Sequence, residues 1–78
     1  MKRFEEALKI DREIGNRQGE ASDLGNIGRV YLRKDELDEA LKYLEEALDI
    51  LNRFNLVYGR DIIEEAIREI KRRKGESQ

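Results

Sequence analysis

Three pairs of adjacent glutamates are the first residues whose type could support acid–base catalysis or metal binding. They are Glu5 with Glu6, Glu45 with Glu46, and Glu64 with Glu65. Adjacent residues on a helix point about 100° apart, so the two carboxylates of a pair do not converge on one substrate or ion. The chain has no histidine and no cysteine, which removes the commonest general base and the commonest metal ligands. We therefore expect no catalytic residue and no metal site.

Two serines are the remaining candidate nucleophiles. Without histidine, only a lysine could activate Ser22 or Ser77, and such an arrangement is a poor basis for covalent catalysis. No strand precedes a glycine-rich turn, so the chain has no nucleotide-binding motif. The sequence predicts a protein that is not an enzyme and needs no cofactor.

A polar group on one helix face could bind a peptide. Arg29 and Arg33 lie one turn apart, with Asn26 beside them. Because guanidinium groups pair well with carboxylates, these residues predict a site for an acidic or C-terminal peptide. The alternative is an ordinary solvated helix face. Ser22 and Gly25 share this face, where Gly25 either leaves room for a ligand backbone or is an exposed, poor helix former.

The charge balance excludes some partners. The net charge is −2, from 16 basic and 18 acidic residues, and neither sign dominates, which argues against nucleic acid or a membrane surface as partner. No apolar run reaches the roughly 18 residues of a membrane span. The charged N-terminus lacks the apolar region of a signal peptide, and we expect a cytoplasmic protein.

Four helices must position these residues. Apolar residues recur at helical spacing over about 2–14, 17–33, 36–54 and within 57–74. The stripe of the first helix comprises Phe4, Ala7, Leu8, Ile10 and Ile14. The inward face of the last helix comprises Ile62, Ile63, Ala66, Ile67 and Ile70.

Local signals mark the helix ends. Gly15 is a candidate left-handed cap, Asn16 a candidate N-cap and Asn55 a stop signal. Asp35 is expected to cap the third helix.

The sequence contains an internal repeat. "FEEALKI" at 4–10 matches "LEEALDI" at 44–50 in five of seven letters, with an offset of 40 residues. The segment "LGNIGRVYLRKDELDEALKYLEEALDI" resembles a tetratricopeptide repeat. The residues that carry this resemblance are Leu24, Ile27, Gly28 and Tyr31 on the first helix, and Leu37, Ala40, Leu44 and Ala47 on the second. The 40-residue spacing is similar to that of the long-helix variant of the family, and Asp35 replaces the usual turn glycine.

The resemblance implies an all-α fold, a short solenoid of antiparallel helical hairpins with about four helices. In such a hairpin Gly28 is expected to face the second helix opposite Ala40. We expect one domain over 1–78, made of a partial repeat (1–15), a complete repeat (16–55), a capping helix (56–75) and a tail (76–78).

The function that the resemblance implies is protein–protein interaction, as an adaptor or scaffold that binds a peptide or partner helix on its concave face. The residues expected on that face are Ser22, Gly25, Asn26, Arg29 and Arg33. The alternative is self-assembly. An array of about three repeats is usually needed to bury every apolar stripe, so the first helix could expose Phe4 and Leu8. Either the chain is then a fragment of a longer array, or the first helix pairs with another copy as a homodimer.

Overall fold

The four expected helices are present. The structure, a computed structural model, describes residues 1–75, and the tail expected over 76–78 lies outside the described residues. The helices are α1 (Lys2–Ile14), α2 (Arg17–Arg33), α3 (Leu37–Arg53) and α4 (Arg60–Lys74). The part of the chain that is described contains no strand, and the all-α prediction is confirmed.

The expected signals end α1 and α3. Gly15 adopts a left-handed φ of 74° after α1, and the side chain of Asn16 accepts a hydrogen bond from the Gly19 amide at 2.9 Å. Asn55 has a φ of 56° after α3. These residues satisfy backbone groups that a helix end leaves without partners.

The prediction for Asp35 is wrong. Asp35 does not cap α3, because Glu36 occupies the cap position, without a side-chain cap bond. Asp35 has a φ of 62°, a left-handed conformation that glycine adopts most easily and aspartate tolerates. This geometry explains why the related repeats place a glycine at this turn.

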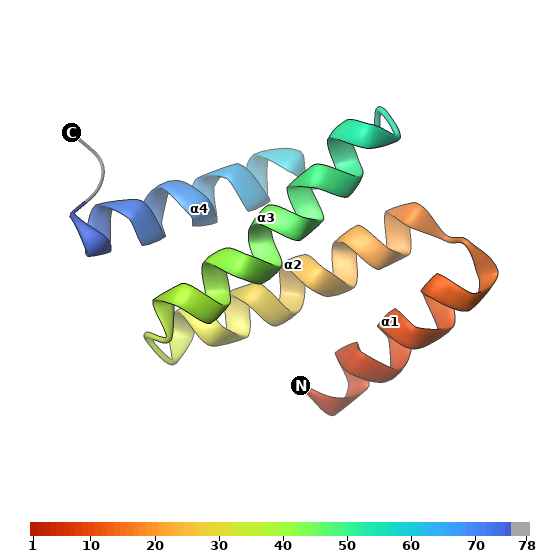
Figure 1. Cartoon of the computed structure of the whole chain (residues 1–78), viewed down its shortest axis with the longest axis horizontal. Coiled ribbons are helices and arrows are strands. Elements are labelled where there is room, and N and C mark those ends of the chain that lie inside the picture. Colours follow the sequence, from red (N-terminus) through yellow and green to blue (C-terminus); the bar gives the residue numbers. More distant parts are fainter. Residues whose placement is uncertain (76–78) are drawn as a thin grey trace.

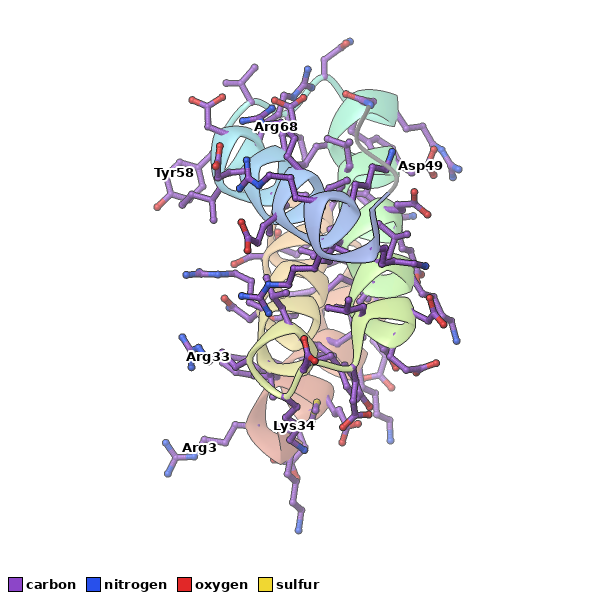
Figure 2. The ribbon with its side chains drawn as sticks, turned by 90° about the vertical axis from the view of Figure 1, so that its left-hand side faces the viewer. Arg3, Arg33, Lys34, Asp49, Tyr58 and Arg68 are labelled. Atoms are coloured by element: carbon purple, nitrogen blue, oxygen red, sulfur yellow. The ribbon has the colours of Figure 1, made fainter. Side chains whose placement is uncertain are left out.

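The helices stack in a row with α1 and α4 outermost. Figure 1 shows α2 and α3 as the central antiparallel hairpin, with α1 beside α2 and α4 beside α3. In the side view of Figure 2, Arg33 and Tyr58 project from one side of the stack and Asp49 of α3 from the other. Arg33, one of the residues expected on the concave face, thus lies on the first side.

A close approach between α2 and α3 depends on Gly28. A Cβ at this position would lie 2.7 Å from Cγ of Leu44 and 3.1 Å from the carbonyl oxygen of Ala40. Both distances are shorter than side chains normally allow, so the backbones can approach this closely only at a glycine. The large side chains buried most completely are Leu24, Ile27, Leu44, Leu51 and Ile70.

The expected apolar stripe of α1 is only partly buried. Ile10 and Ile14 of α1 are 54% and 70% exposed, whereas Leu8 is buried and Phe4 packs against the core. The expectation that Phe4 and Leu8 are the exposed residues is therefore wrong. A single neighbouring helix, α2, covers one face of α1 and leaves the face with the isoleucines open.

The sequence predicts no membrane-spanning segment. None of the four described helices is long and apolar enough to cross a membrane.

Candidate binding groove

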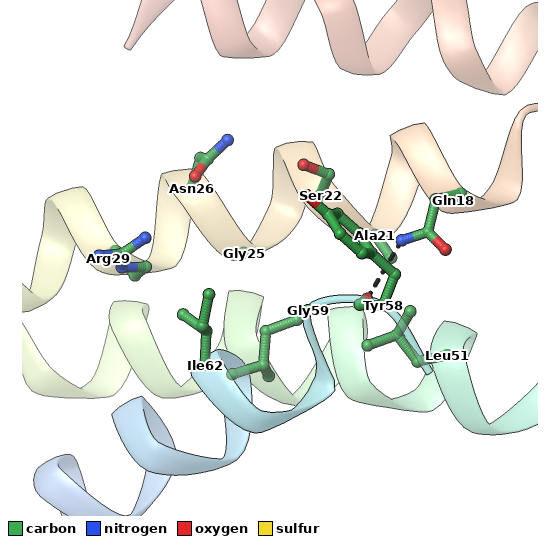
Figure 3. Close-up of a pocket in the computed structure, with 11 residues that line it drawn as sticks. Gln18, Ala21, Ser22, Gly25, Asn26, Arg29, Leu51, Tyr58, Gly59 and Ile62 are labelled. Carbon is green, nitrogen blue, oxygen red and sulfur yellow. Dashed lines mark hydrogen bonds between the residues drawn. The ribbon is translucent and has the colours of Figure 1, made fainter. Parts of the chain in front are cut away.

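A hollow of about 250 Å³ lies between α2 and α4. Figure 3 shows its two walls, with α2 along one side and the start of α4 along the other. We call this hollow and its extension along α4 the groove. The residues that line the hollow are Gln18, Ala21, Ser22, Gly25, Asn26 and Arg29 of α2, Tyr58 and Gly59 before α4, Ile62 and Ile63 of α4, and Leu51 of α3.

Four of the five residues expected on the concave face line this hollow. Ser22, Gly25, Asn26 and Arg29 all contribute to the α2 wall. Arg33 lines neither the hollow nor its extension, and it lies exposed at the end of α2. The structure therefore brings the first four residues together and leaves Arg33 beyond them.

Gly25 differs from both expectations for it. It is buried, and a Cβ there would lie 3.4 Å from Cδ1 and Cγ1 of Ile63. Gly25 is thus neither an exposed helix position nor simply free space for a ligand. It forms part of the floor where α4 crosses α2, at ordinary van der Waals distance from a hypothetical methyl group.

The α4 wall was missed in the sequence. Ile62, expected in the core, is 55% exposed, and Tyr58 at the rim is 77% exposed. The 40-residue offset could have found both, because Ile62 stands at the repeat position of Ser22, and Tyr58 at that of Gln18. The side chain of Gln18 also donates a hydrogen bond to the Tyr58 carbonyl oxygen at 3.2 Å, which ties the two walls together (Figure 3).

The groove continues along α4 with opposite charges on its two walls. Arg29 and Ile62 also line this extension, together with Asp61, Glu65 and Glu69 on α4. A hydrogen bond from Arg68 holds the pKa of Glu65 below its ordinary value. Hydrogen bonds from Arg72 and Arg73 do the same for Glu69. Both carboxylates are therefore ionised at neutral pH, and each forms ion pairs with arginines of α4 itself.

A second polar cluster lies outside the groove, between α1 and α2. Glu20 is only 6% exposed and accepts hydrogen bonds from Arg12 at 3.1 Å and Arg17 at 2.9 Å. Burial opposes the charge of Glu20, but the two guanidinium groups outweigh it and lower its pKa. Arg12 also bonds Glu46 of α3 at 3.1 Å, so this cluster fastens α1 to the central hairpin.

Asp23 completes this cluster without a cation of its own. It is 9% exposed, and its Oδ2 makes no hydrogen bond to the described residues. Burial, and then the adjacent carboxyl of Asp11, raises the pKa of Asp23 to about 6. Asp11 and Asp23 stand at the repeat positions of Leu51 and Ile63, which are both buried. The α1–α2 contact thus has a carboxyl pair where the α3–α4 contact has apolar side chains.

The carboxylates do not build a metal site. Within residues 1–75, no three side chains of the metal-binding types gather closely enough to hold an ion.

Comparison with known proteins agrees with the hairpin geometry. The family model for the tetratricopeptide repeat matches residues 2–53, from the start of α1 to the end of α3. No curated protein and no solved structure matches the chain. Tetratricopeptide repeats generally mediate protein–protein interaction and are typically not catalytic. Because the match covers more than half of its 78 residues, the chain belongs to the tetratricopeptide repeat family.

Proposed function

We propose that this protein is a non-catalytic interaction module that binds a peptide segment or a partner helix in the groove between α2 and α4. The observation that carries this proposal is the hollow of about 250 Å³ with an apolar floor and polar walls. Such concave sites, mostly apolar with a few placed polar groups, are the usual places for ligands.

Apolar contact would supply most of the affinity. Ala21, Gly25 and Ile63 form a floor that is already buried, while Ile62 and Tyr58 remain exposed above it. An apolar side chain of a partner would cover these two residues, gaining about 25 cal/mol per Å² of apolar surface removed from water. The groove therefore favours a segment with one apolar anchor.

Charge would set the orientation of the bound segment. Arg29 on α2 suits an acidic group, such as an aspartate or a C-terminal carboxylate. Asp61 on the opposite wall suits a basic group, whereas Glu65 and Glu69 already pair with arginines of α4. We therefore propose an acidic residue of the ligand on the α2 side and a basic residue on the α4 side, with Arg33 available to a longer segment.

The proposal can be tested with a displayed library of random peptides. Peptides selected on the purified protein are measured by fluorescence polarisation against the unmodified chain and two variants. Ile62→Glu should weaken binding at least roughly tenfold, because about 1.4 kcal/mol of apolar contact is enough for that loss. The double variant Arg29→Ala with Arg33→Ala should abolish binding of the acidic peptides.

Matched controls separate the groove from general effects. Ile14→Glu places the same substitution at an exposed isoleucine far from the groove, and Arg53→Ala removes an exposed arginine of α3. Both should leave the affinity unchanged. Equal affinity of the selected peptides for the Ile62→Glu variant and the unmodified chain would refute the groove as the binding site.

Self-assembly, the alternative function, would use another surface. Leu8 is buried in its own chain and Phe4 is partly buried against the core, so other residues of α1 would supply most of that surface. The exposed Ile10 and Ile14 are the residues of α1 that favour it. A cytoplasmic place of action is an expectation from the sequence.

A further inference from the structure

The outer face of α1 is an apolar surface separate from the groove. Its apolar residues are Ala7, Ile10 and Ile14, which recur at helical spacing along α1, with Arg3 one turn before Ala7. Arg3 projects from the same side of the stack as Arg33 and Tyr58 (Figure 2). Ile10 is 54% exposed and Ile14 is 70% exposed. Figure 1 shows α1 as an outer helix of the stack. Two exposed isoleucines one turn apart on this helix are a candidate contact surface.

The internal repeat shows what normally covers such a face. Ile10 and Ala7 stand at the repeat positions of Ile50 and Ala47, which are 7% and 0% exposed in α3. On α3, α2 covers this face: Tyr43, the equivalent of Arg3, stacks on Tyr31 with ring centroids 5.5 Å apart. None of the described residues covers the same face of α1. Within residues 1–75, this face of α1 therefore has no helix packed against it.

A row of charges borders the outer face. Lys2, Glu6, Lys9 and Glu13 follow one another along the helix with alternating sign. None of the four forms an ion pair with any residue in the described range 1–75. On α4, by contrast, the exposed acidic groups pair with arginines of the same helix, as Glu65 does with Arg68.

We propose that a second copy of this chain covers the outer face, so that two α1 helices pair antiparallel about a two-fold axis. Read from Lys2 to Glu13 the charges are +, −, +, −, and read in the opposite direction they are −, +, −, +, so each charge meets its opposite. An antiparallel second copy therefore places Lys2 opposite Glu13 of that copy and Glu6 opposite its Lys9, each pair occurring twice. In a parallel pair about a two-fold axis the two charge rows would lie on opposite sides of the contact and would not meet.

The apolar residues fit the same arrangement. In that register Ala7 lies near Ile10 of the second copy, and a small residue opposite a large one lets two helices approach closely. Both isoleucines of each copy then leave water, which supplies the main driving force.

The other end of the molecule does not offer an equivalent partner. In α4, Arg68 stands at the repeat position of Gly28, the residue that permits the close α2–α3 contact. Arg68 and Arg72 are held by Glu65 and Glu69 on the outside of α4. Stacking α1 of one copy against α4 of another would break these pairs and meet bulky side chains, so the α1–α1 arrangement is favoured.

Sedimentation equilibrium from low micromolar to near-millimolar concentration tests the proposal. The mass should rise toward twice the 9.2 kDa of one chain. The double variant Ile10→Glu with Ile14→Glu should stay monomeric, while Ile62→Glu on the groove should dimerise as the unmodified chain does. Circular dichroism checks that each variant is folded.

A charge swap tests the antiparallel register. Lys9→Glu should weaken dimerisation roughly tenfold, because two symmetry-related ion pairs become like-charge contacts. Adding Glu6→Lys to the same chain restores opposite charges and should restore the dimer.

Three results would overturn the proposal. They are a monomer at every concentration, a dimer that Ile62→Glu disrupts but the Ile10 and Ile14 substitutions do not, and a charge swap that fails to restore association. None of these results depends on whether the groove binds a peptide, so the two proposals fail separately.

Discussion

At the scale of single residues, two glycines of α2 have different surroundings although they lie one turn apart. Gly28 faces the α3 backbone, and a Cβ there would approach Leu44 within 2.7 Å. Gly25 faces the flexible end of Ile63, and a Cβ there would keep an ordinary distance of 3.4 Å. The same substitution should therefore have opposite effects at the two positions.

Gly28→Ala should lower the free energy of unfolding by about 1–2 kcal/mol, because overpacking against Leu44 and Ala40 outweighs the gain in helix propensity. Gly25→Ala should leave stability unchanged or raise it by up to about 1 kcal/mol, since only the propensity gain remains. Urea unfolding of both variants measures this difference. If Gly28→Ala is the more stable of the two, the close contact between α2 and α3 is not as described.

At the scale of elements, the α1–α2 contact should respond to pH. Asp23 has a pKa of about 6 in the folded chain, raised by burial and by Asp11 from its ordinary 3.8. The folded state therefore binds more protons than the unfolded state between these values. Stability from this group is present at low pH and decreases as the pH rises through about 6.

The expected change in the free energy of unfolding with pH follows from these two pKa values. Between pH 5 and pH 7.5, Asp23 should cost the folded state about 1 kcal/mol. Asp23→Asn should remove this loss and make the chain more stable at pH 7.5, because an amide does not ionise beside Asp11. Urea unfolding of both chains at the two pH values checks the prediction. A difference that does not change with pH would show that the pKa of Asp23 is not raised in the folded state.

The sequence predicts those features of the helices that depend on neighbouring residues in the chain, and it does not predict those that depend on how the helices pack. Gly15 ends α1 through its own left-handed backbone, and Asn16 begins α2 through its own side-chain hydrogen bond. Both helix ends can therefore be predicted from the local sequence. Ile62 and Gly25 could not be placed by helical periodicity, because their burial depends on how α4 crosses α2. Asp23 was missed because a search for apolar periodicity passes over buried polar residues, although its repeat equivalent Ile63 is apolar.

At the scale of the whole molecule, the two ends of the helix row differ. The exposed side of α4 carries arginine–glutamate pairs, whereas α1 exposes Ile10 and Ile14. The groove lies along α2 and α4, and the outer face of α1 belongs to the other end of the stack (Figure 1). Peptide binding and self-association can therefore occur on one molecule without competing for surface.

The most direct test of the account is to map a selected peptide onto the ¹⁵N-labelled protein by nuclear magnetic resonance. The account predicts that amide shifts change along the groove, at Ser22, Gly25, Asn26 and Ile62, and that α1 and the Asp49 side of α3 do not respond. Changes confined to α1 or to the exposed side of α3 would contradict it, because the peptide would then bind outside the hollow between α2 and α4.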